Sequence, residues 1–507
     1  MSFAGLAFIF HFLPAFLIAY YLTPVKHRRL TLLAGSLAFY GIGSPLYLCL
    51  LIGSVLINYG ISVRIHHLAK KKATKSAKSS TIHRKRAWLI VAIIYNIGIL
   101  FTFKYYDTVA AGINKILGSI DGADSQLGAA SGVGGWQLPE LGLLLPLGIS
   151  FYTFQMLSFI FDVYSRKIKG RVSLYHFAVY ATMFPQIGAG PIVRFVDINQ
   201  DIYRPSPVKG HTLERGMMFF AVGLSYKVLL ADKLASLWTD VWRVGVSGID
   251  VASAWLGAWG YSLQILFDFS GYSLMAIGVG LMLGFGLPEN FNEPYSAKTM
   301  TDFWRRWHIT LGKWFRDYIY IPMGGSRRGR GRMILAMFVV WMTTGLWHGA
   351  SLNFIIWGLF LFVTMLVEKL LTNKWLEGSR VLGHIYMFIL IPVSWMIFNI
   401  TDVGILGEYL LRMVGGLVDT ASADSLLMST VTFGVAGMNG FELFLELIGN
   451  YWWLLVLGAF FATPLPRKFF LKYEKTIWVK APLFLLFWLS VYELAVSSNN
   501  PFIYFGF

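Results

Sequence analysis

The sequence predicts an all-α protein, a polytopic bundle of transmembrane helices. Of its 507 residues, 56% are hydrophobic and 14% are charged, whereas typical soluble proteins contain about 25% charged residues. The second observation is a set of nearly uncharged stretches, each about long enough to cross a hydrocarbon core of about 30 Å as a helix: 4–22, 30–44, 46–63, 87–103, 141–161, 333–347, 351–367 and 383–400. The stretches also lack the alternating segments of about 10 residues that a β-barrel needs.

Net charge and cysteine usage exclude several function classes. The formal net charge of +17 would suggest nucleic-acid binding in a soluble protein. Here the basic residues lie in loops beside predicted spans, as orientation signals do, so we expect membrane lipids as surroundings and no nucleic-acid partner. The one cysteine, Cys49, lies in an apolar run and allows no intrachain disulfide. A buried cysteine of this kind usually behaves as a small hydrophobic residue.

The basic clusters predict the orientation of the first five crossings. Segments 26–29, 64–86 and 165–171 are rich in lysine and arginine, whereas the loop 105–139 is rich in glycine and serine and is expected to be flexible. Cytoplasmic loops carry the excess of positive charge, so the N-terminus is predicted to lie outside. The stretch 4–22 lacks the basic start and cleavage site of a signal peptide and is expected to be retained. Segment 64–86 could also contact anionic lipid or an acidic partner.

The middle of the chain is predicted to contain broken helices. Glycine and proline interrupt the apolar runs at 184–195 and 265–280. Broken helices are tolerated at membrane depth only where protein or a water-filled cavity supplies partners for the backbone. We therefore expect these segments to line a cavity, with close helix packing as the alternative use of the glycines. The total expected is about eleven spans plus one or two re-entrant segments. No internal repeat of fixed period is found, which disfavours transporters built from symmetric halves.

Two histidines stand out in this apolar chain. Residues 303–318 are predicted to form one amphipathic helix at the membrane interface, with His308 on its aromatic face. The next span is predicted to start near Met333, which places His348 about 22 Å further along a helix that rises about 1.5 Å per residue. Ionisable groups at such depth usually face a bundle interior or a cavity. For both histidines, a hydrogen bond to a neighbouring carbonyl is the structural alternative.

The histidines favour general-base chemistry if the protein is an enzyme. Imidazole titrates near neutral pH and can take a proton from a hydroxyl. The sequence contains no G-x-S-x-G elbow, Walker A loop, H-E-x-x-H motif or Rossmann fingerprint. His66, His67 and His83 lie together without cysteine or carboxylate, so no metal site is expected. Acyl transfer without a covalent serine or cysteine intermediate remains as the enzymatic reading.

At these residues the sequence resembles the membrane-bound O-acyltransferases, in the bacterial branch of alginate O-acetylation and D-alanyl transfer to teichoic acids. RRWHITLGKWFRDYIYIPMGG (305–325) and LWHGASLNFIIWG (346–358) are similar to the two histidine signatures of that branch. Further similar blocks follow in family order at 148–164, 184–194, 267–273 and 290–295, and the C-terminal PFIYFGF also resembles this branch.

The resemblance implies a single membrane-embedded domain over 1–507, with its core at about 148–358 and a ring of spans around a central tunnel. It implies an O-acyltransferase of a bacterial cytoplasmic membrane that uses a cytoplasmic thioester, acetyl-coenzyme A or an acyl carrier protein, and binds no cofactor. The acyl group, expected to be acetyl, would reach a hydroxyl of an extracytoplasmic polysaccharide or a partner acyltransferase. His348 matches the principal catalytic histidine of the family, and His308 matches the second one.

Roles for individual residues follow as hypotheses. His348 is predicted to be the general base, and His308 to donate a hydrogen bond to the thioester carbonyl or to position the donor. Guanidinium groups pair well with phosphate, although each arginine could instead be a topology signal. The polar side chains in apolar runs could orient substrates or join helices. The candidate substrate-binding residues at the donor mouth or tunnel are Trp304, Arg305, Arg306, Trp307, Gln155 and Asn353, with Arg327, Arg328 and Arg330 as further phosphate candidates.

The acceptor and one alternative class stay open at this point. Leu274 stands where the alginate branch usually carries aspartate, and Glu293 where an apolar residue is expected, so alginate, cellulose, peptidoglycan and teichoic acid all remain candidate acceptors. Asp162 and Asp268 lie in apolar runs, as they would in a lipid or glycan transporter. A secretion-complex subunit without acyltransferase chemistry is a weaker alternative.

Overall fold

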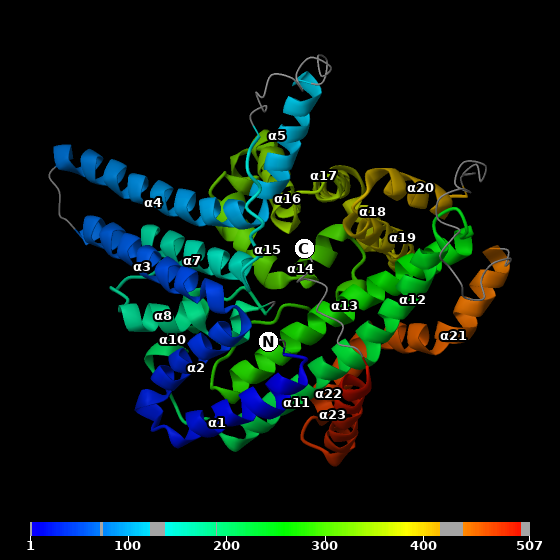
Figure 1. Ribbon diagram of the computed structural model, residues 1–507, viewed down its shortest axis with the longest axis horizontal. Helices are drawn as coiled ribbons and strands as arrows, with labels where there is room; N and C mark the ends of the chain where they lie inside the picture. Colours follow the sequence, from blue (N-terminus) through cyan, green and yellow to red (C-terminus); the bar gives the residue numbers. More distant parts are fainter. Residues whose placement is uncertain (1–2, 71–74, 122–136, 189, 416–439, 498–507) are drawn as a thin grey trace, which may run out of the picture. The chain divides into compact units, whose positions relative to one another are not determined.

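A computed structural model describes residues 3–70, 75–121, 137–188, 190–415 and 440–497, which contain helices and no β-strand. The α-helices (Figure 1) are, in chain order, α1 (Leu13–Leu22), α2 (Arg28–Gly43), α3 (Leu48–Lys70), α4 (Lys75–Lys104), α5 (Tyr106–Asp121), α7 (Ile149–Tyr164), α8 (Leu174–Thr182), α9 (Phe184–Ile187), α10 (Phe195–Tyr203), α11 (Gly210–Ser225), α12 (Asp232–Val244), α13 (Val251–Met282), α14 (Met300–Arg306), α15 (Ile309–Phe315), α16 (Arg330–His348), α17 (Leu352–Val367), α18 (Asn373–Gly378), α19 (Arg380–Asn399), α20 (Val403–Met413), α21 (Gly440–Phe461), α22 (Pro464–Tyr473) and α23 (Ile477–Val496). Short 3₁₀ and π segments are η1 (Phe8–Phe12), η2 (Val25–His27), η3 (Pro45–Tyr47), η5 (Tyr226–Ala231), η6 (Pro294–Ser296), η7 (Arg316–Tyr320), η8 (Gly325–Arg328) and η9 (Glu368–Thr372).

The all-α, multi-pass membrane class predicted from the sequence is confirmed. Within the described residues, seven helices are long and apolar enough to cross a membrane: Pro45–Lys70, Ser80–Lys104, Val251–Met282, Leu352–Thr372, Arg380–Asn399, Phe441–Phe461 and Ile477–Val496. Four of these contain all or most of a predicted stretch, namely 46–63, 87–103, 351–367 and 383–400. The last two spans lie beyond all eight stretches.

Several of the predicted apolar stretches form elements shorter than a full span within the described residues. The stretch 4–22 forms a short apolar helix over Phe8–Leu22, and α2 has 16 residues. Within 141–161, helix begins only at Ile149. The 19-residue α16 begins with arginines and ends at His348, so its apolar centre is shorter than the other spans. The predicted flexible loop 105–139 instead begins with α5, and its glycine-rich part lies outside the described residues, as does the C-terminal PFIYFGF.

The predicted break at 265–280 is wrong, because α13 is one continuous helix of 32 residues. Its glycines serve the close approach of α11. A Cβ atom on Gly271 would lie 2.7 Å from the carbonyl oxygen of Gly223, and one on Gly278 would lie 2.5 Å from that of Gly216. Small residues of this kind let helix backbones meet in membranes. The break predicted at 184–195 is confirmed, since α9 has only 4 residues.

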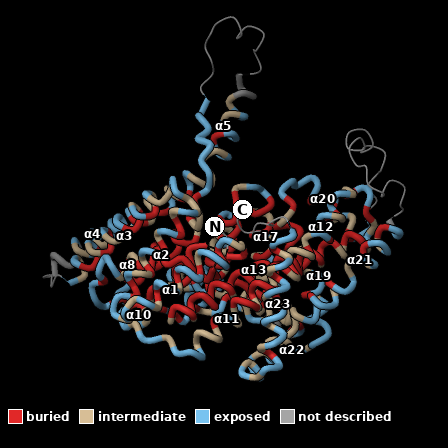
Figure 2. The backbone as a smooth tube through the Cα atoms, turned by 60° about the horizontal axis from the view of Figure 1, so that its bottom comes forward, coloured by how far each residue is buried: buried red, intermediate tan, exposed pale blue. Residues whose placement is uncertain are grey.

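Helix α13 forms the core of the larger of two compact units, which comprises residues 1–31, 189–193 and 197–507. It packs against α11, α12, α19, α20 and α21. Its apolar window is 89% buried, against 17–50% for the other six spans, and Figure 2 shows it as a nearly continuous buried segment. The other spans therefore present much of their apolar surface outward, as helices facing lipid do.

A buried ion pair joins α13 to the preceding π segment η5. The Lys227 Nζ atom lies 2.8 Å from Asp268 and 2.7 Å from Asp232. Lys227 and Asp268 are both almost fully buried, with side chains 5% and 1% exposed. Charged side chains inside membrane proteins are costly unless they are paired. The pairing supplies the buried Asp268 carboxylate with a counter-charge inside the bundle.

The smaller unit, residues 32–188 and 194–196, is built around α3, α4, α7 and α8. The side-chain amides of Asn58 on α3 and Asn96 on α4 exchange two hydrogen bonds of 3.2 and 2.7 Å, and the two helices lie side by side in Figure 1. Reciprocal amide bonds of this kind join helices in apolar surroundings. The assignment of 1–507 to a single domain stays a prediction.

Candidate active site

The segment that carries His308 is broken rather than helical throughout. Helix α14 ends at Arg306, Trp307 is extended, and α15 begins at Ile309, so the prediction of one helix over 303–318 is wrong. The cause is backbone pairing with a distant loop: the Ile309 N–H donates to the Asn290 carbonyl at 2.9 Å, and the Asn292 N–H donates to the Arg306 carbonyl at 2.9 Å. At the break itself the side chains are buried within the protein, since Trp307 is 3% and His308 2% exposed.

His308 has a left-handed backbone conformation, with φ 43° and ψ 53°. Among the described residues, only Arg166 and Glu293 share a positive φ without being glycine. Such a conformation costs on the order of 1–3 kcal/mol and tends to cluster at functional sites. The turn allows the imidazole to reach Asn290.

A hydrogen-bonded network holds the His308 ring. The Oδ1 atom of Asn290 lies 3.0 Å from His308 Nδ1, 2.8 Å from the Thr310 hydroxyl and 3.3 Å from the Thr310 backbone nitrogen. The Asn290 amide nitrogen donates to Ser273 Oγ on α13 at 3.0 Å, and the Ile192 N–H donates to the Thr310 hydroxyl at 3.0 Å. The sequence analysis did not single out Asn290, Ser273 or Thr310. The sequence feature that could have indicated them is that they lie inside the family-like blocks 267–273, 290–295 and 305–325.

This network determines where the His308 proton lies. A backbone N–H can only donate, so the Asn290 atom facing Thr310 is the carbonyl oxygen, and it can only accept. His308 Nδ1 must therefore carry the hydrogen, which leaves the lone pair on Nε2 of the neutral ring. Burial lowers the pKa of His308 from 6.5 to about 3 because a charged imidazolium loses its hydration there. The ring is neutral at physiological pH.

The loop that carries Asn290 is tied to the C-terminal part of the chain. Arg467 on α22 contacts both carboxylate oxygens of Glu289 at 2.9 Å and the Glu293 carboxylate at 3.6 Å, and it donates to the Asn292 side chain. Glu293, the departure from the family pattern, thus has an ion-pair partner. Because the Arg467 and Glu289 side chains are 34% and 56% exposed, this pair adds little stability; it positions the loop.

His348 lies at the end of α16 inside a cage of aromatic rings. Its ring centroid is 4.7 Å from that of Trp347, 5.2 Å from Trp357, 5.0 Å from Phe398 and 6.2 Å from Phe354. Only 5% of the residue is exposed, so its surroundings shield most of the imidazole from solvent. Trp347 also lies 6.5 Å from the His308 ring. The rings of His308 and His348 therefore both lie near the Trp347 ring.

Close packing of α16 and α17 builds the cage. A Cβ atom on Gly358 would lie 2.6 Å from the Trp341 carbonyl oxygen, and one on Gly345 would overlap the Phe354 carbonyl. Asn353 donates to the carbonyls of Ile397 and Phe398 at 3.2 and 2.8 Å. Asn353 thus joins α17 to α19, which is the structural alternative given for it from the sequence. Its Oδ1 atom is buried and accepts no hydrogen bond within the described chain.

Comparison with known proteins decides the family. The model of the membrane-bound O-acyltransferase family matches residues 151–401. The chain is 36% identical over 403 residues to the probable alginate O-acetylase of Pseudomonas aeruginosa, covering 79% of this chain and 72% of that protein. The chain belongs to the membrane-bound O-acyltransferase family. It is also 33% identical over 526 residues to the probable alginate O-acetylase of Pseudomonas putida, covering 100% of both, and 32% identical over 451 residues to the peptidoglycan O-acetyltransferase of Helicobacter pylori, covering 81% and 78%.

Trp304 and Trp307 connect α14 to the cage of this O-acyltransferase. The Trp304 ring lies 5.0 Å from Trp341 and 5.6 Å from Trp357, and Trp307 lies 4.8 Å from Trp395. The Trp304 Nε1 atom is buried without a hydrogen-bond partner in the described structure. A buried indole N–H usually finds a partner, so this donor can meet a bound polar group.

The arginines predicted to bind phosphate are exposed or form an ion pair within α14. Arg305, Arg327, Arg328 and Arg330 are exposed. Arg306 pairs with Asp302 one turn earlier on α14 at 2.9 Å, an arrangement that contributes little to stability when half exposed. These side chains have no contact with either histidine that would assign them to catalysis.

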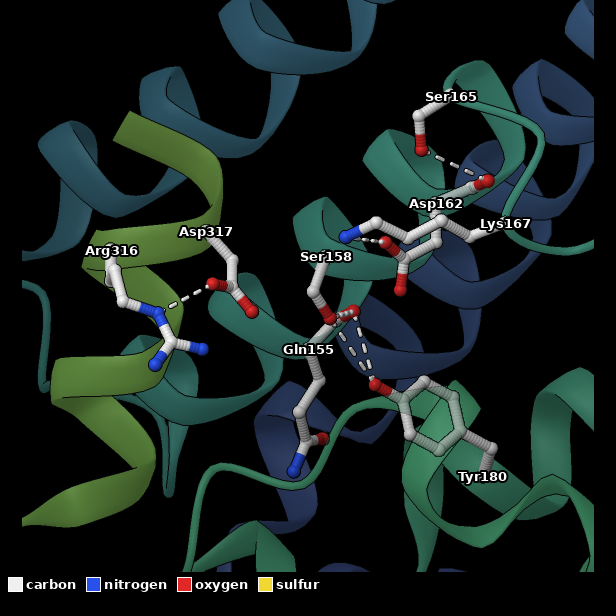
Figure 3. Close-up of polar contacts among 8 residues, drawn as sticks. All are labelled: Gln155, Ser158, Asp162, Ser165, Lys167, Tyr180, Arg316 and Asp317. Atoms are coloured by element: carbon white, nitrogen blue, oxygen red, sulfur yellow. Dashed lines mark hydrogen bonds and ion pairs between the residues drawn. The ribbon is translucent and has the colours of Figure 1, made fainter. Parts of the chain in front are cut away.

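Gln155 lies in the smaller unit, on α7. The residue is fully buried, and its backbone carbonyl accepts from the Ser158 hydroxyl at 2.7 Å and the Tyr180 hydroxyl at 3.2 Å. Figure 3 shows the carboxamide extending away from these hydroxyls, and it has no hydrogen-bond partner within the described residues. Asp162 pairs with Lys167 at 3.3 Å. Figure 3 also draws the pair of Arg316 and Asp317, which belongs to the larger unit.

Proposed function

We propose that this O-acyltransferase moves an acetyl group from a cytoplasmic thioester, acetyl-coenzyme A or an acyl carrier protein, to a hydroxyl of an extracytoplasmic polysaccharide or of a partner acyltransferase. The membrane is the cytoplasmic membrane of a bacterium, and the N-terminus lies outside. The observation that carries the proposal is the pair of buried imidazoles that share Trp347 in a helix bundle. Support for acetyl as the group comes from the names of the relatives that match over most of their length.

The proposed reaction needs one base and one leaving thiol. His348 takes the proton of the attacking hydroxyl as its oxygen bonds to the thioester carbonyl carbon. The carbon–sulfur bond breaks, and the thiolate leaves with the proton that His348 held. Low polarity around a ring packed by Trp347, Trp357 and Phe398 strengthens each electrostatic contact in the transition state. Trp304, Trp307, Arg305, Arg306, Gln155 and Asn353 remain proposals for substrate contacts.

The substitution His348→Ala tests the proposal in cells that carry this chain as their one source of polymer acylation. Because a positioned base contributes about 10²- to 10⁴-fold in rate, we expect acylation of the surface polymer to fall below detection by mass analysis. The mass difference in the wild type identifies the acyl group and the polymer. A finding of an alanyl group or of a different polymer would correct the proposed substrate.

The matched control is His384→Ala, because His384 is an exposed histidine on α19. Both variants must be present in the membrane fraction at the wild-type level by immunoblot. Full acylation with His348→Ala under these conditions would refute the assignment of the base.

A further inference from the structure

We infer that His308 works through Nε2 as a hydrogen-bond acceptor, and that Asn290 is the positioning residue that imposes this role. The inference rests on the proposed acyl transfer for its chemical consequence, whereas the proton position itself follows from the network. Neither the family match nor the predicted roles assigned a function to Asn290.

The orientation of the Asn290 amide is fixed from several sides. Its Oδ1 atom faces the Thr310 N–H and hydroxyl as well as His308 Nδ1, and its nitrogen faces Ser273. A flipped amide would set an NH2 group against the Thr310 N–H and lose these hydrogen bonds. The Thr310 hydroxyl already accepts from Ile192 N–H, so its own hydrogen is directed to Asn290.

The backbone and one aromatic ring hold the imidazole in the same place. The Ile309 N–H donates to the Asn290 carbonyl, which couples the two residues through main chain as well as side chain. The Phe269 ring lies 4.7 Å away at 85°, edge to face with the imidazole. A 180° turn of the ring would place Cδ2 where Nδ1 lies and would lose the hydrogen bond to Asn290.

The position of the proton limits which substrate groups can form a hydrogen bond with His308. A neutral ring with hydrogen on Nδ1 has no proton on Nε2 to donate. The oxygen of a thioester carbonyl only accepts, so it is not the partner of this ring, and the predicted hydrogen bond from His308 to that carbonyl does not fit the network. The group that meets Nε2 must carry a hydrogen: a hydroxyl of the acceptor or an amide N–H of the donor's carrier arm. His308 orients that group, and proton transfer stays with His348.

The charged groups on the elements packed around His308 are engaged elsewhere. Asp268, next to Phe269 on α13, pairs with Lys227; Glu289, next to Asn290, pairs with Arg467; and Asp302 on α14 pairs with Arg306. Lys313 on α15 and both Arg330 and Arg332 at the start of α16 are exposed, and His348 at the end of α16 lies beyond Trp347. Burial is the cause of the lowered pKa of the ring.

Nuclear magnetic resonance reads the proton position directly, without any substrate. The full chain, with ring-¹⁵N-labelled histidine, is placed in lipid nanodiscs, and the His308 signals are identified by subtracting the spectrum of His308→Gln. We expect a protonated Nδ1 and a non-protonated Nε2 at pH 7 that persist at pH 5. A protonated Nε2 at pH 7 would overturn the inference.

Asn290→Asp and Asn290→Leu test the positioning role, with acetyl-coenzyme A as donor probe, alginate oligosaccharide as acceptor probe, and thiol release as readout. The carboxylate keeps the hydrogen on Nδ1 and raises the pKa of His308, so the acid limb of the pH profile should move to higher pH. The leucine variant should show a mixed proton position and lose about 10- to 100-fold in rate, the loss typical when a partner that orients an imidazole is removed. A changed KM for acetyl-coenzyme A in His308→Gln identifies an amide N–H as the partner, and a changed KM for the oligosaccharide identifies a hydroxyl.

Asn292→Asp is the matched control, because it adds the same charge two residues away but faces Arg467. It should leave the pH profile in place. Wild-type spectra and profiles for both Asn290 variants would refute the role of Asn290. If the wild type releases no thiol from acetyl-coenzyme A, the proposed function fails, while the spectra still decide the proton position.

Discussion

The two histidines are held by different physical means. His308 lies at a strained break between short helices and is fixed by hydrogen bonds to Asn290. His348 ends a regular helix, and the contacts described for it are with aromatic rings from α16, α17 and α19. Hydrogen bonds specify which nitrogen carries the proton, whereas ring packing specifies position and excludes water. The described contacts thus differ in kind: hydrogen bonds orient the His308 ring, and aromatic rings surround His348.

The largest expected effect on stability and acyl transfer comes from disturbing the aromatic cage around His348. Gly358→Leu forces α17 away from α16, because even a Cβ atom would lie 2.6 Å from a backbone oxygen of Trp341. Overpacking typically costs about 1–3 kcal/mol, and we expect the upper end of this range together with loss of acyl transfer. Thermal unfolding in detergent and thiol release measure the two effects.

The control for Gly358→Leu is Gly449→Leu on α21, where nothing lies within 4 Å of an added Cβ atom. It should fold and work as the wild type does. Equal stability of the two variants would show that the approach of α16 and α17 does not build the cage.

A smaller effect is expected at Asn353, which ties the cage to α19. Asn353→Leu leaves the carbonyls of Ile397 and Phe398 without their donor, at a cost of about 1–2 kcal/mol within the range for unsatisfied buried groups. A lower melting temperature with an unchanged KM for acetyl-coenzyme A would support the structural role. A raised KM at unchanged stability would instead support the substrate contact predicted from the sequence.

The last prediction concerns His308 and the dependence of stability on pH. The pKa of His308 is about 3 in the folded chain and 6.5 without burial, so between these values the unfolded chain binds the extra proton. The free energy of unfolding therefore falls as pH decreases from about 6.5 towards 3, by at most about 1.4 kcal/mol per pH unit.

Thermal unfolding at pH 7 and pH 5 measures this slope. The decrease on acidification should be smaller for His308→Gln than for the wild type, while His384→Gln, at an exposed position, should match the wild type. Identical slopes for all three chains would mean that His308 is not buried in its neutral form.

Uninterrupted apolar length was a sound guide to the fold. The stretches 46–63 and 87–103, and all but the first residue of 351–367, lie inside spans of the structure, because lipid forces such segments to be helical. Glycine was a poor guide. In α13, Gly271 and Gly278 do not break the helix, since their function is contact with Gly223 and Gly216 on α11. That contact joins residues about fifty positions apart and leaves no local pattern.

For the site, too, one prediction from the sequence was accurate and another was not. The spacing that placed His348 deep in the bundle agrees with its burial. The period that made 303–318 a single helix did not reveal the break at His308, because the break depends on backbone bonds to residues 290 and 292. Local periodicity carries no information on such long-range pairing. Asn290 was therefore visible only as part of a family block.

The burial of α13 has a consequence for how the chain is made. A helix that carries Asp268 and shows lipid almost none of its surface is a poor candidate to leave the translocation machinery alone, since a lone carboxylate in hydrocarbon is costly. Its counter-charge, Lys227, is synthesised just before it. We expect the two segments to wait beside the insertion channel and to be released into the bilayer together, so that biogenesis of this enzyme depends on a helical hairpin rather than on single helices.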